Sequence, residues 1–176
     1  GGLLDLWQDH KGLAMVEAAL LLPLILSLTF GIYDLGRAIV LNQKVVAAAQ
    51  ISADLITRER TLNTGEIDQA VAAARLALHP YDESLLGVDI AGLRFDSDAS
   101  PYECWRQTVG PIMANTASID DAQGLGLAGE GVIMVTTRYV YTPFFTGVFL
   151  GDFEFEEVAF FRGRKTPYLQ LEGVSC

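Results

Sequence analysis

Two cysteines, Cys104 and Cys176, are the side chains of this 176-residue chain best suited to a covalent role. A bridge between them is favoured if the domain is exported to an oxidising compartment, where disulfides persist. Closing so long a loop contributes about 4 kcal/mol of stability in the chain-entropy account. The alternative is a pair of unpaired thiols in the cytoplasm, so the disulfide prediction depends on export.

Groups suited to catalysis or metal binding are sparse. His10 and His79 belong to no metal-spaced cluster and to no catalytic-triad signature. The acids at 96–98 and 120–121 lack the twelve-residue loop and terminal glutamate of a calcium site, so we interpret them as solvated turns. We therefore predict that the protein is not an enzyme and uses no metal, cofactor or small-molecule substrate.

Two further patterns have a simpler explanation than ligand binding. The run Gly124–Gly129 has the letters of the G-x-G-x-x-G dinucleotide fingerprint, but no strand precedes it and no helix follows it, so a flexible loop is expected. Several phenylalanines are expected in the core rather than on a ligand-stacking platform: Phe144, Phe145, Phe149, Phe160 and Phe161.

The composition excludes two broad classes of protein. Half of the chain (51%) is apolar and only 19% is charged, which is the reverse of a disordered protein. The net charge of −10 argues against a nucleic-acid binder, because phosphate must be met by a basic surface.

The apolar excess is concentrated in Leu13–Ile32, whose single charge is Glu17. As a helix these residues span about 30 Å, the thickness of a bilayer's hydrocarbon core. A buried core helix would show a polar face, and a signal peptide would be shorter and followed by small residues, whereas Phe30 and Tyr33 follow here. We predict a transmembrane helix, in which Pro23 and Gly31 are tolerated.

The residues after this helix predict a folded domain on which its continuation packs. Helical periodicity continues through an extension at 33–60 and ends near Arg58, with Asp34 among the polar groups at exposed spacing. Within 61–176, Asn63 and Glu66 predict the start of a short helix that stops at His79-Pro80 and packs on the sheet. Strands are expected at 88–95 with a break at Gly92, and at 102–108, 132–142 and 153–161.

These elements predict an α+β fold, in which the long N-terminal helix packs through its C-terminal half on an antiparallel sheet of about four strands. The charges that flank the span, Lys11 before it and Arg37 and Lys44 after it, lean weakly against export of the C-terminal part.

Two adjacent motifs resemble a known family. Lys11–Leu24 reads KGLAMVEAALLLPL, and Phe30–Ala38 reads FGIYDLGRA. Both are similar to the N-terminal signature of TadE-like proteins of the bacterial tight-adherence (Tad/Flp) pilus system. The resemblance implies a pilin-like fold and a single-pass inner-membrane protein whose domain 61–176 lies in the periplasm, with possible incorporation in a surface pilus.

The resemblance also implies roles for particular residues. Residues 1–12 would be a leader-like segment that prepilin peptidase removes at Gly12–Leu13; Gly1 is not preceded by methionine, and we expect a processed, trimmed or truncated N-terminus. Glu17 would be the acid at the fifth position, which pairs with the new ammonium group of a neighbouring subunit. Ala18 and the large exported domain favour a minor pilin, or pseudopilin, over the shaft subunit.

The implied partners are other minor pilins, the major pilin as a further candidate, prepilin peptidase and the inner membrane. The helix would carry the contacts between subunits, with Pro23, Leu24 and Leu26 beside Glu17 as the assembly residues. The alternative is a bitopic periplasmic scaffold or binding protein that does not enter the filament.

Overall fold

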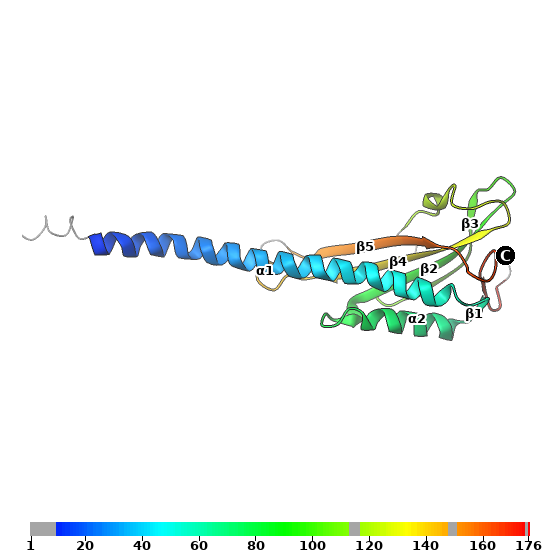
Figure 1. Ribbon diagram of the computed structural model, residues 1–176, viewed down its shortest axis with the longest axis horizontal. Helices are drawn as coiled ribbons and strands as arrows, with labels where there is room; N and C mark the ends of the chain where they lie inside the picture. The colour runs from blue at the N-terminus through cyan, green and yellow to red at the C-terminus, as the bar shows by residue number, and fades with distance from the viewer. Residues whose placement is uncertain (1–9, 113–116, 148–150, 175) are drawn as a thin grey trace, which may run out of the picture.

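The computed structural model describes residues 10–112, 117–147, 151–174 and 176. One helix of 47 residues, α1 (His10–Ile56), runs the length of the molecule. Its C-terminal half lies on a four-stranded sheet and forms, with the residues after it, the body of the molecule (Figure 1). Its N-terminal half, residues 10–32, projects from this body, and we call it the rod. The α+β fold class predicted from the sequence, with its long N-terminal helix, is confirmed.

Helix α1 includes Pro23 without ending there. Proline removes the backbone donor that would serve the carbonyl oxygen of Ala19, and such prolines are tolerated in membrane-spanning helices. One turn further on, the hydroxyls of Ser27 and Thr29 donate to the carbonyl oxygens of Pro23 and Ile25 at 2.5 and 2.8 Å, so both hydroxyls have a partner within the helix. The helix ends at Ile56, two residues before the predicted end at Arg58.

The sheet has the order β3-β2-β4-β5, and all neighbouring strands are antiparallel. Its strands lie close to the predicted ranges: β2 (Leu86–Phe95), β3 (Pro101–Val109), β4 (Gly131–Tyr141) and β5 (Phe153–Phe161).

The predicted break at Gly92 is a register shift between Gly92 and Leu93 in the pairing of β2 with β3. Gly92 lies opposite Trp105 of β3, and a β-carbon at residue 92 would overlap the indole ring. Glycine therefore makes room for the tryptophan at this point of the sheet.

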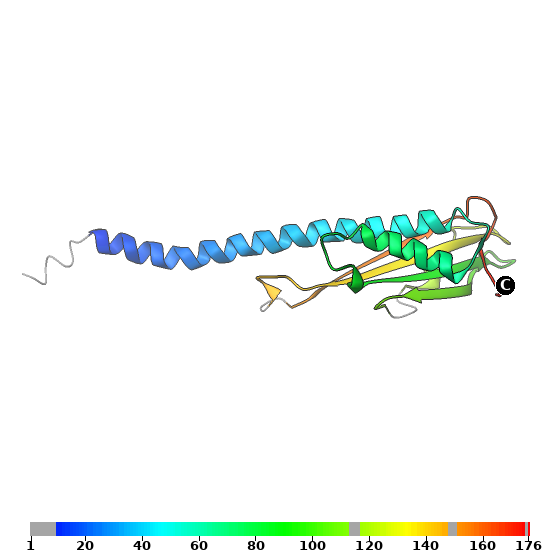
Figure 2. The ribbon, with the colours of Figure 1, turned by 90° about the horizontal axis from the view of Figure 1, so that it is seen from below.

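Helix α2 (Thr64–Leu76) begins with the predicted capping box. The side chain of Asn63 accepts from the N–H of Glu66, and the carboxylate of Glu66 accepts from the N–H of Asn63, both at 2.9 Å. The helix ends at Leu76, three residues before His79. It lies beside α1 (Figure 2) and packs chiefly against α1, with fewer contacts to β3, rather than mainly on the sheet as predicted.

Two apolar clusters cover the two faces of the sheet. The larger one joins α1, α2 and one face of the sheet, and the alanines of α1 let the two helices approach closely. The smaller one lies on the opposite face, under the connection that contains the 3-10 turn η3 (Ile119–Ala122). The larger cluster includes Leu41, Val45, Ala48, Ala49, Ile67, Val71, Ile90 and Val135.

The C-terminal tail closes the end of the body that is remote from the free rod. A two-residue parallel ladder joins β1 (Thr61–Leu62) to β6 (Gln170–Leu171), and the N–H of Arg164 donates to the carbonyl oxygen of Thr57 at 3.1 Å. Another 3-10 turn, η2 (Glu83–Leu85), leads from α2 into β2. The short ladder has no counterpart among the predicted elements, because two residues carry no periodicity.

Candidate membrane and assembly site

The free half of α1 is a rod of exposed apolar side chains. Leu24 and Leu26 are 64% and 44% exposed, and their apolar neighbours are exposed as well. Within the described residues, one helix is long and apolar enough to cross a membrane, and its most apolar window has no buried share. A core helix of a soluble protein would be mostly buried, so the rod has the properties of a membrane anchor.

The predicted processing and assembly residues lie along this rod. Gly12 and Leu13 are in the first turn of α1, Glu17 is exposed one turn further on, and Pro23 lies inside the helix. Among the described residues, Glu17 has no hydrogen bond or ion pair to another side chain. The functional roles of these residues, and of Leu24 and Leu26, stay predictions.

Asp34 fastens the helix to the sheet where the rod meets the body. Its carboxylate accepts hydrogen bonds from the N–H groups of Phe144, Phe145 and Thr146, at 3.2, 2.9 and 2.6 Å. It also accepts from the hydroxyl of Thr146 at 2.9 Å. The expectation that Asp34 is exposed is wrong, since the residue is 3% exposed, and the reason is this contact with the connection between β4 and β5.

An aromatic cluster surrounds this contact. The ring of Phe145 stacks on Phe30 with centroids 4.2 Å apart and meets Tyr33 edge-on at 5.7 Å. Phe144 packs edge-on against Phe145 at 4.8 Å. The guanidinium of Arg37 lies over the ring of Tyr33, 5.9 Å from its centroid. Helix and connection are therefore joined by apolar packing as well as by hydrogen bonds.

The phenylalanines predicted for the core are partly buried in some positions and exposed in others. Phe144 and Phe145 are 74% and 36% exposed, so the core prediction is wrong for both, because they sit at the tip of the connection between two strands. Phe160 and Phe161 are half-buried against the two clusters, and Phe149 lies outside the described residues.

A groove of about 450 Å³ continues from the rod along the body, between α1 and the edge strand β5. Leu35 and Ile39 of the helix and Phe153 of the strand line it and are exposed. The apolar surface of α1 therefore does not stop where the body begins.

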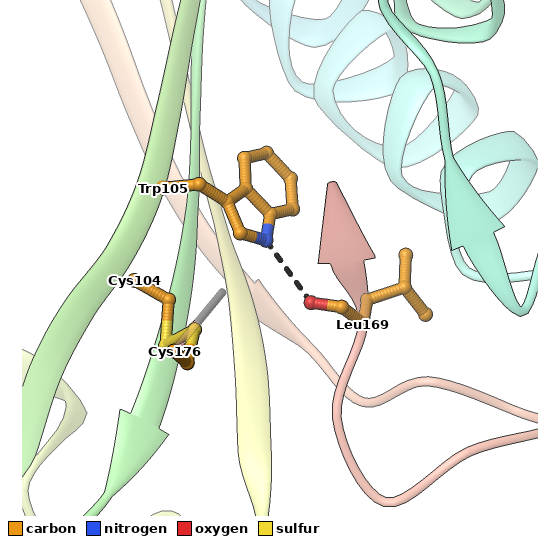
Figure 3. The surroundings of a disulfide bond; sticks show 4 residues. All are labelled: Cys104, Trp105, Leu169 and Cys176. Atoms are coloured by element: carbon orange, nitrogen blue, oxygen red, sulfur yellow. Dashed lines mark hydrogen bonds between the residues drawn. A yellow bond between two sulfur atoms is a disulfide. The ribbon is translucent and has the colours of Figure 1, made fainter. Parts of the chain in front are cut away.

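Cys104 of β3 and Cys176 are joined by a disulfide, the pairing expected from the sequence, with their α-carbons 5.3 Å apart (Figure 3). Next to it the indole N–H of Trp105 donates to the carbonyl oxygen of Leu169 at 3.0 Å. The tail is thus held to β3 by a covalent bond and by a buried hydrogen bond.

Several polar groups elsewhere in the body are paired with one another. On the face of β2 away from α1, Arg106 donates to buried Asp89 at 2.5 Å and to Glu103 at 2.9 Å. Burial raises the pKa of Asp89 above its usual range; the charge of Arg106 opposes this rise and that of Glu103 adds to it. Asp96 accepts from the N–H groups of Asp98 and Ser100, as expected of a turn acid.

The Gly124–Gly129 run forms turns and leads into β4 rather than into a helix, so it lacks the context of a dinucleotide site. In the part of the chain that the structure describes, no group of three or more histidine, cysteine or acidic side chains is arranged to hold a metal ion.

This arrangement defines a class: proteins with one exposed apolar helix that can span a membrane and a small α+β body packed on the continuation of the same helix. Residues 12–54 match the family model of TadE-like proteins, which confirms over those residues the resemblance found in the sequence motifs. The match covers the rod and most of the part of α1 that packs on the body. No curated protein and no solved structure matches the chain.

Asp34 is the residue that sequence reasoning missed. It lies in the motif that carries the family resemblance, Phe30–Ala38, and in the region that matches the family model. An acid beside the end of an apolar span is a signal for a specific partner, because an unpaired charge there is costly. Its partner could not be named, since the loop whose N–H groups donate to it lies about 110 residues further along the chain.

Proposed function

We propose that the protein is a membrane-anchored minor pilin, or pseudopilin, that takes part in the initiation or tip complex of a tight-adherence type IV pilus. The observation that carries this proposal is the exposed apolar rod of α1, which coincides with the match to TadE-like proteins. The match supports a membrane protein associated with the Tad pilus. The role is structural and not catalytic.

In this proposal the rod lies in the bacterial inner membrane and the body in the periplasm, before the helix leaves the bilayer to pack among other pilin helices. Leu24 and Leu26 offer apolar surface for such packing, and the groove beside Leu35 extends it onto the body. The partners are other minor pilins, with the major pilin as a further candidate. The pilus would serve surface attachment.

Glu17 has a defined place in this assembly. Cleavage by prepilin peptidase at Gly12–Leu13 would leave the ammonium group of Leu13 at the start of the helix. An ionised carboxylate near the membrane interface is moderately costly, and a neighbouring subunit's ammonium group offsets that cost. Because desolvation cancels much of the attraction, the pair contributes mainly to the axial register between helices.

The first experiment compares Glu17→Gln with Glu172→Gln in a strain that lacks the native protein. Both variants remove one charge from an exposed glutamate, but Glu172 lies on the tail at the far end of the body. We expect Glu17→Gln to reach the membrane at normal levels and to impair piliation and surface adherence, while Glu172→Gln behaves as wild type. Normal pili in Glu17→Gln would contradict the pairing, and loss of the protein would place Glu17 in folding or insertion instead.

The second experiment is mass spectrometry of the N-terminus of the protein from native cells and from sheared pili. A chain that begins at Leu13 and is present in the pili supports a processed minor pilin. An uncleaved chain that stays in the membrane fraction supports the alternative, a bitopic periplasmic scaffold or binding protein.

A further inference from the structure

The tip of the connection between β4 and β5 lies level with the end of the predicted span. If Leu13–Ile32 fills the hydrocarbon core, Phe30 lies about 3 Å inside its boundary, at 1.5 Å per residue. Phe145 stacks on Phe30, which places the tip at the same depth. Figure 2 shows this tip as the part of the body that reaches furthest towards the free rod.

The side chains of the tip suit the membrane interface. Phe144 is largely exposed, and together with Phe145 and Tyr33 it forms an aromatic surface that is continuous with the apolar rod. Aromatic and apolar side chains are the usual anchors at this level of a bilayer. Arg37, whose guanidinium lies over the rings of Tyr33 and Tyr81, adds a positive charge near the lipid phosphates.

The backbone N–H groups of the tip can also leave water without losing a hydrogen bond. Irregular backbone at membrane depth is tolerated only where its polar groups are satisfied by the protein. Pro143 has no N–H group, and the N–H groups of Phe144, Phe145 and Thr146 all donate to the carboxylate of Asp34. All the backbone donors from 143 to 146 therefore have an internal partner or do not exist.

We propose that residues Pro143–Thr146 are a second membrane contact, which inserts Phe144 and Phe145 into the interfacial layer of the bilayer next to the end of the span. This inference rests on the proposed membrane anchoring of α1. Asp34 is the positioning residue, because it holds the tip against the helix and accepts hydrogen bonds from its backbone N–H groups. Two contacts in place of one fix the tilt and the rotation of the body over the membrane.

The test uses the full chain in vesicles of phosphatidylcholine and phosphatidylglycerol, with few protein molecules per vesicle. Phe144→Cys is labelled with a polarity-sensitive nitrobenzoxadiazole dye, which reacts at residue 144 because the two native cysteines are bonded to each other. Leu127→Cys is the control, since Leu127 is 70% exposed in a loop at the other end of the body. We expect lipids spin-labelled near the headgroup to quench the dye at 144 several-fold and to leave the dye at 127 unquenched.

A third label, at Leu24→Cys in the rod, separates the two proposals. Quenching at 24 without quenching at 144 would overturn the second contact and leave the anchor intact, whereas no quenching at either position would remove the anchor itself. A blue-shifted dye at 144 that lipids do not quench would mean that protein covers the tip, which also overturns the inference.

The role of Asp34 has its own readout. Asp34→Asn keeps the shape of the side chain but replaces one acceptor oxygen by a donor, so the N–H groups of the tip lose part of their internal partner. We expect the dye at 144 to lose most of its quenching in this variant while the dye at 24 keeps it. Equal quenching at 144 with and without the substitution would overturn the positioning role of Asp34.

Discussion

Removing the disulfide should destabilise the body by an amount that the length of the closed loop sets. Cys104 and Cys176 are 72 residues apart. In the chain-entropy account a loop of this length removes roughly 15 cal/mol/K from the unfolded chain, or about 4 kcal/mol at 25 °C. In a chain of this size each kcal/mol shifts the thermal midpoint by about 2–4 °C, so we expect Cys104→Ser with Cys176→Ser to lower it by about 8–16 °C.

The native tail should survive this change. The hydrogen bond from Trp105 to Leu169 and the ladder between β1 and β6 hold the tail independently of the sulfur atoms. The loss of stability should therefore come mainly through the unfolded state, with little change in the circular dichroism spectrum of the folded protein at 20 °C.

The assay is thermal unfolding of the full chain in detergent micelles, followed by circular dichroism. Wild-type protein reduced under the same conditions is the matched control, and its midpoint should coincide with that of the double variant. A fall of less than about 2 °C in both samples would refute the loop-entropy reasoning, because it would mean that the tail is confined even when the chain is unfolded.

Two further substitutions probe the sheet, each measured by urea unfolding in micelles. Gly92→Ala should cost about 1–3 kcal/mol, because the added methyl group displaces the ring of Trp105; an unchanged midpoint would show that the indole shifts freely. Because the pKa of Asp89 is raised in the folded state, the folded state favours the protonated acid. The stabilisation from protonated Asp89 is complete below the unfolded-state pKa of about 3.9 and is lost as pH rises through the folded-state pKa. Wild type should therefore lose stability relative to Asp89→Asn as pH rises across that window. If the stability of wild type relative to Asp89→Asn instead rises with pH, or does not change, the charge of Arg106 offsets or outweighs the effect of burial.

The elements with local signals could be predicted from the sequence. The span, the long helix and the strands at 132–142 and 153–161 follow from hydropathy and periodicity, and the capping box at Asn63 follows from two residue types three positions apart. Gly92 was a useful mark of a break in a strand, although only the structure identifies Trp105 as its cause.

The features that depend on distant contacts could not be predicted. Asp34 has the polar character of an exposed residue, and its burial follows from a loop about 110 residues away. Phe144 is apolar, yet it sits on a tip where it is 74% exposed among the residues that the structure describes. The preference of α2 for α1 over the sheet likewise depends on how the two helices pack, which no pattern within either helix expresses.

The fastening of α1 at both ends of the body has a mechanical consequence. Near the rod Asp34 binds the hairpin tip, and near the end of the helix Asp54 pairs with Arg164 of the tail. These points are about 30 Å apart along the helix axis, and the apolar cluster lies between them. A pull on the free rod along that axis therefore loads the whole contact in shear, so that its bonds must yield together rather than one after another. Helix and body should consequently move as one rigid unit when the rod is pulled along its axis.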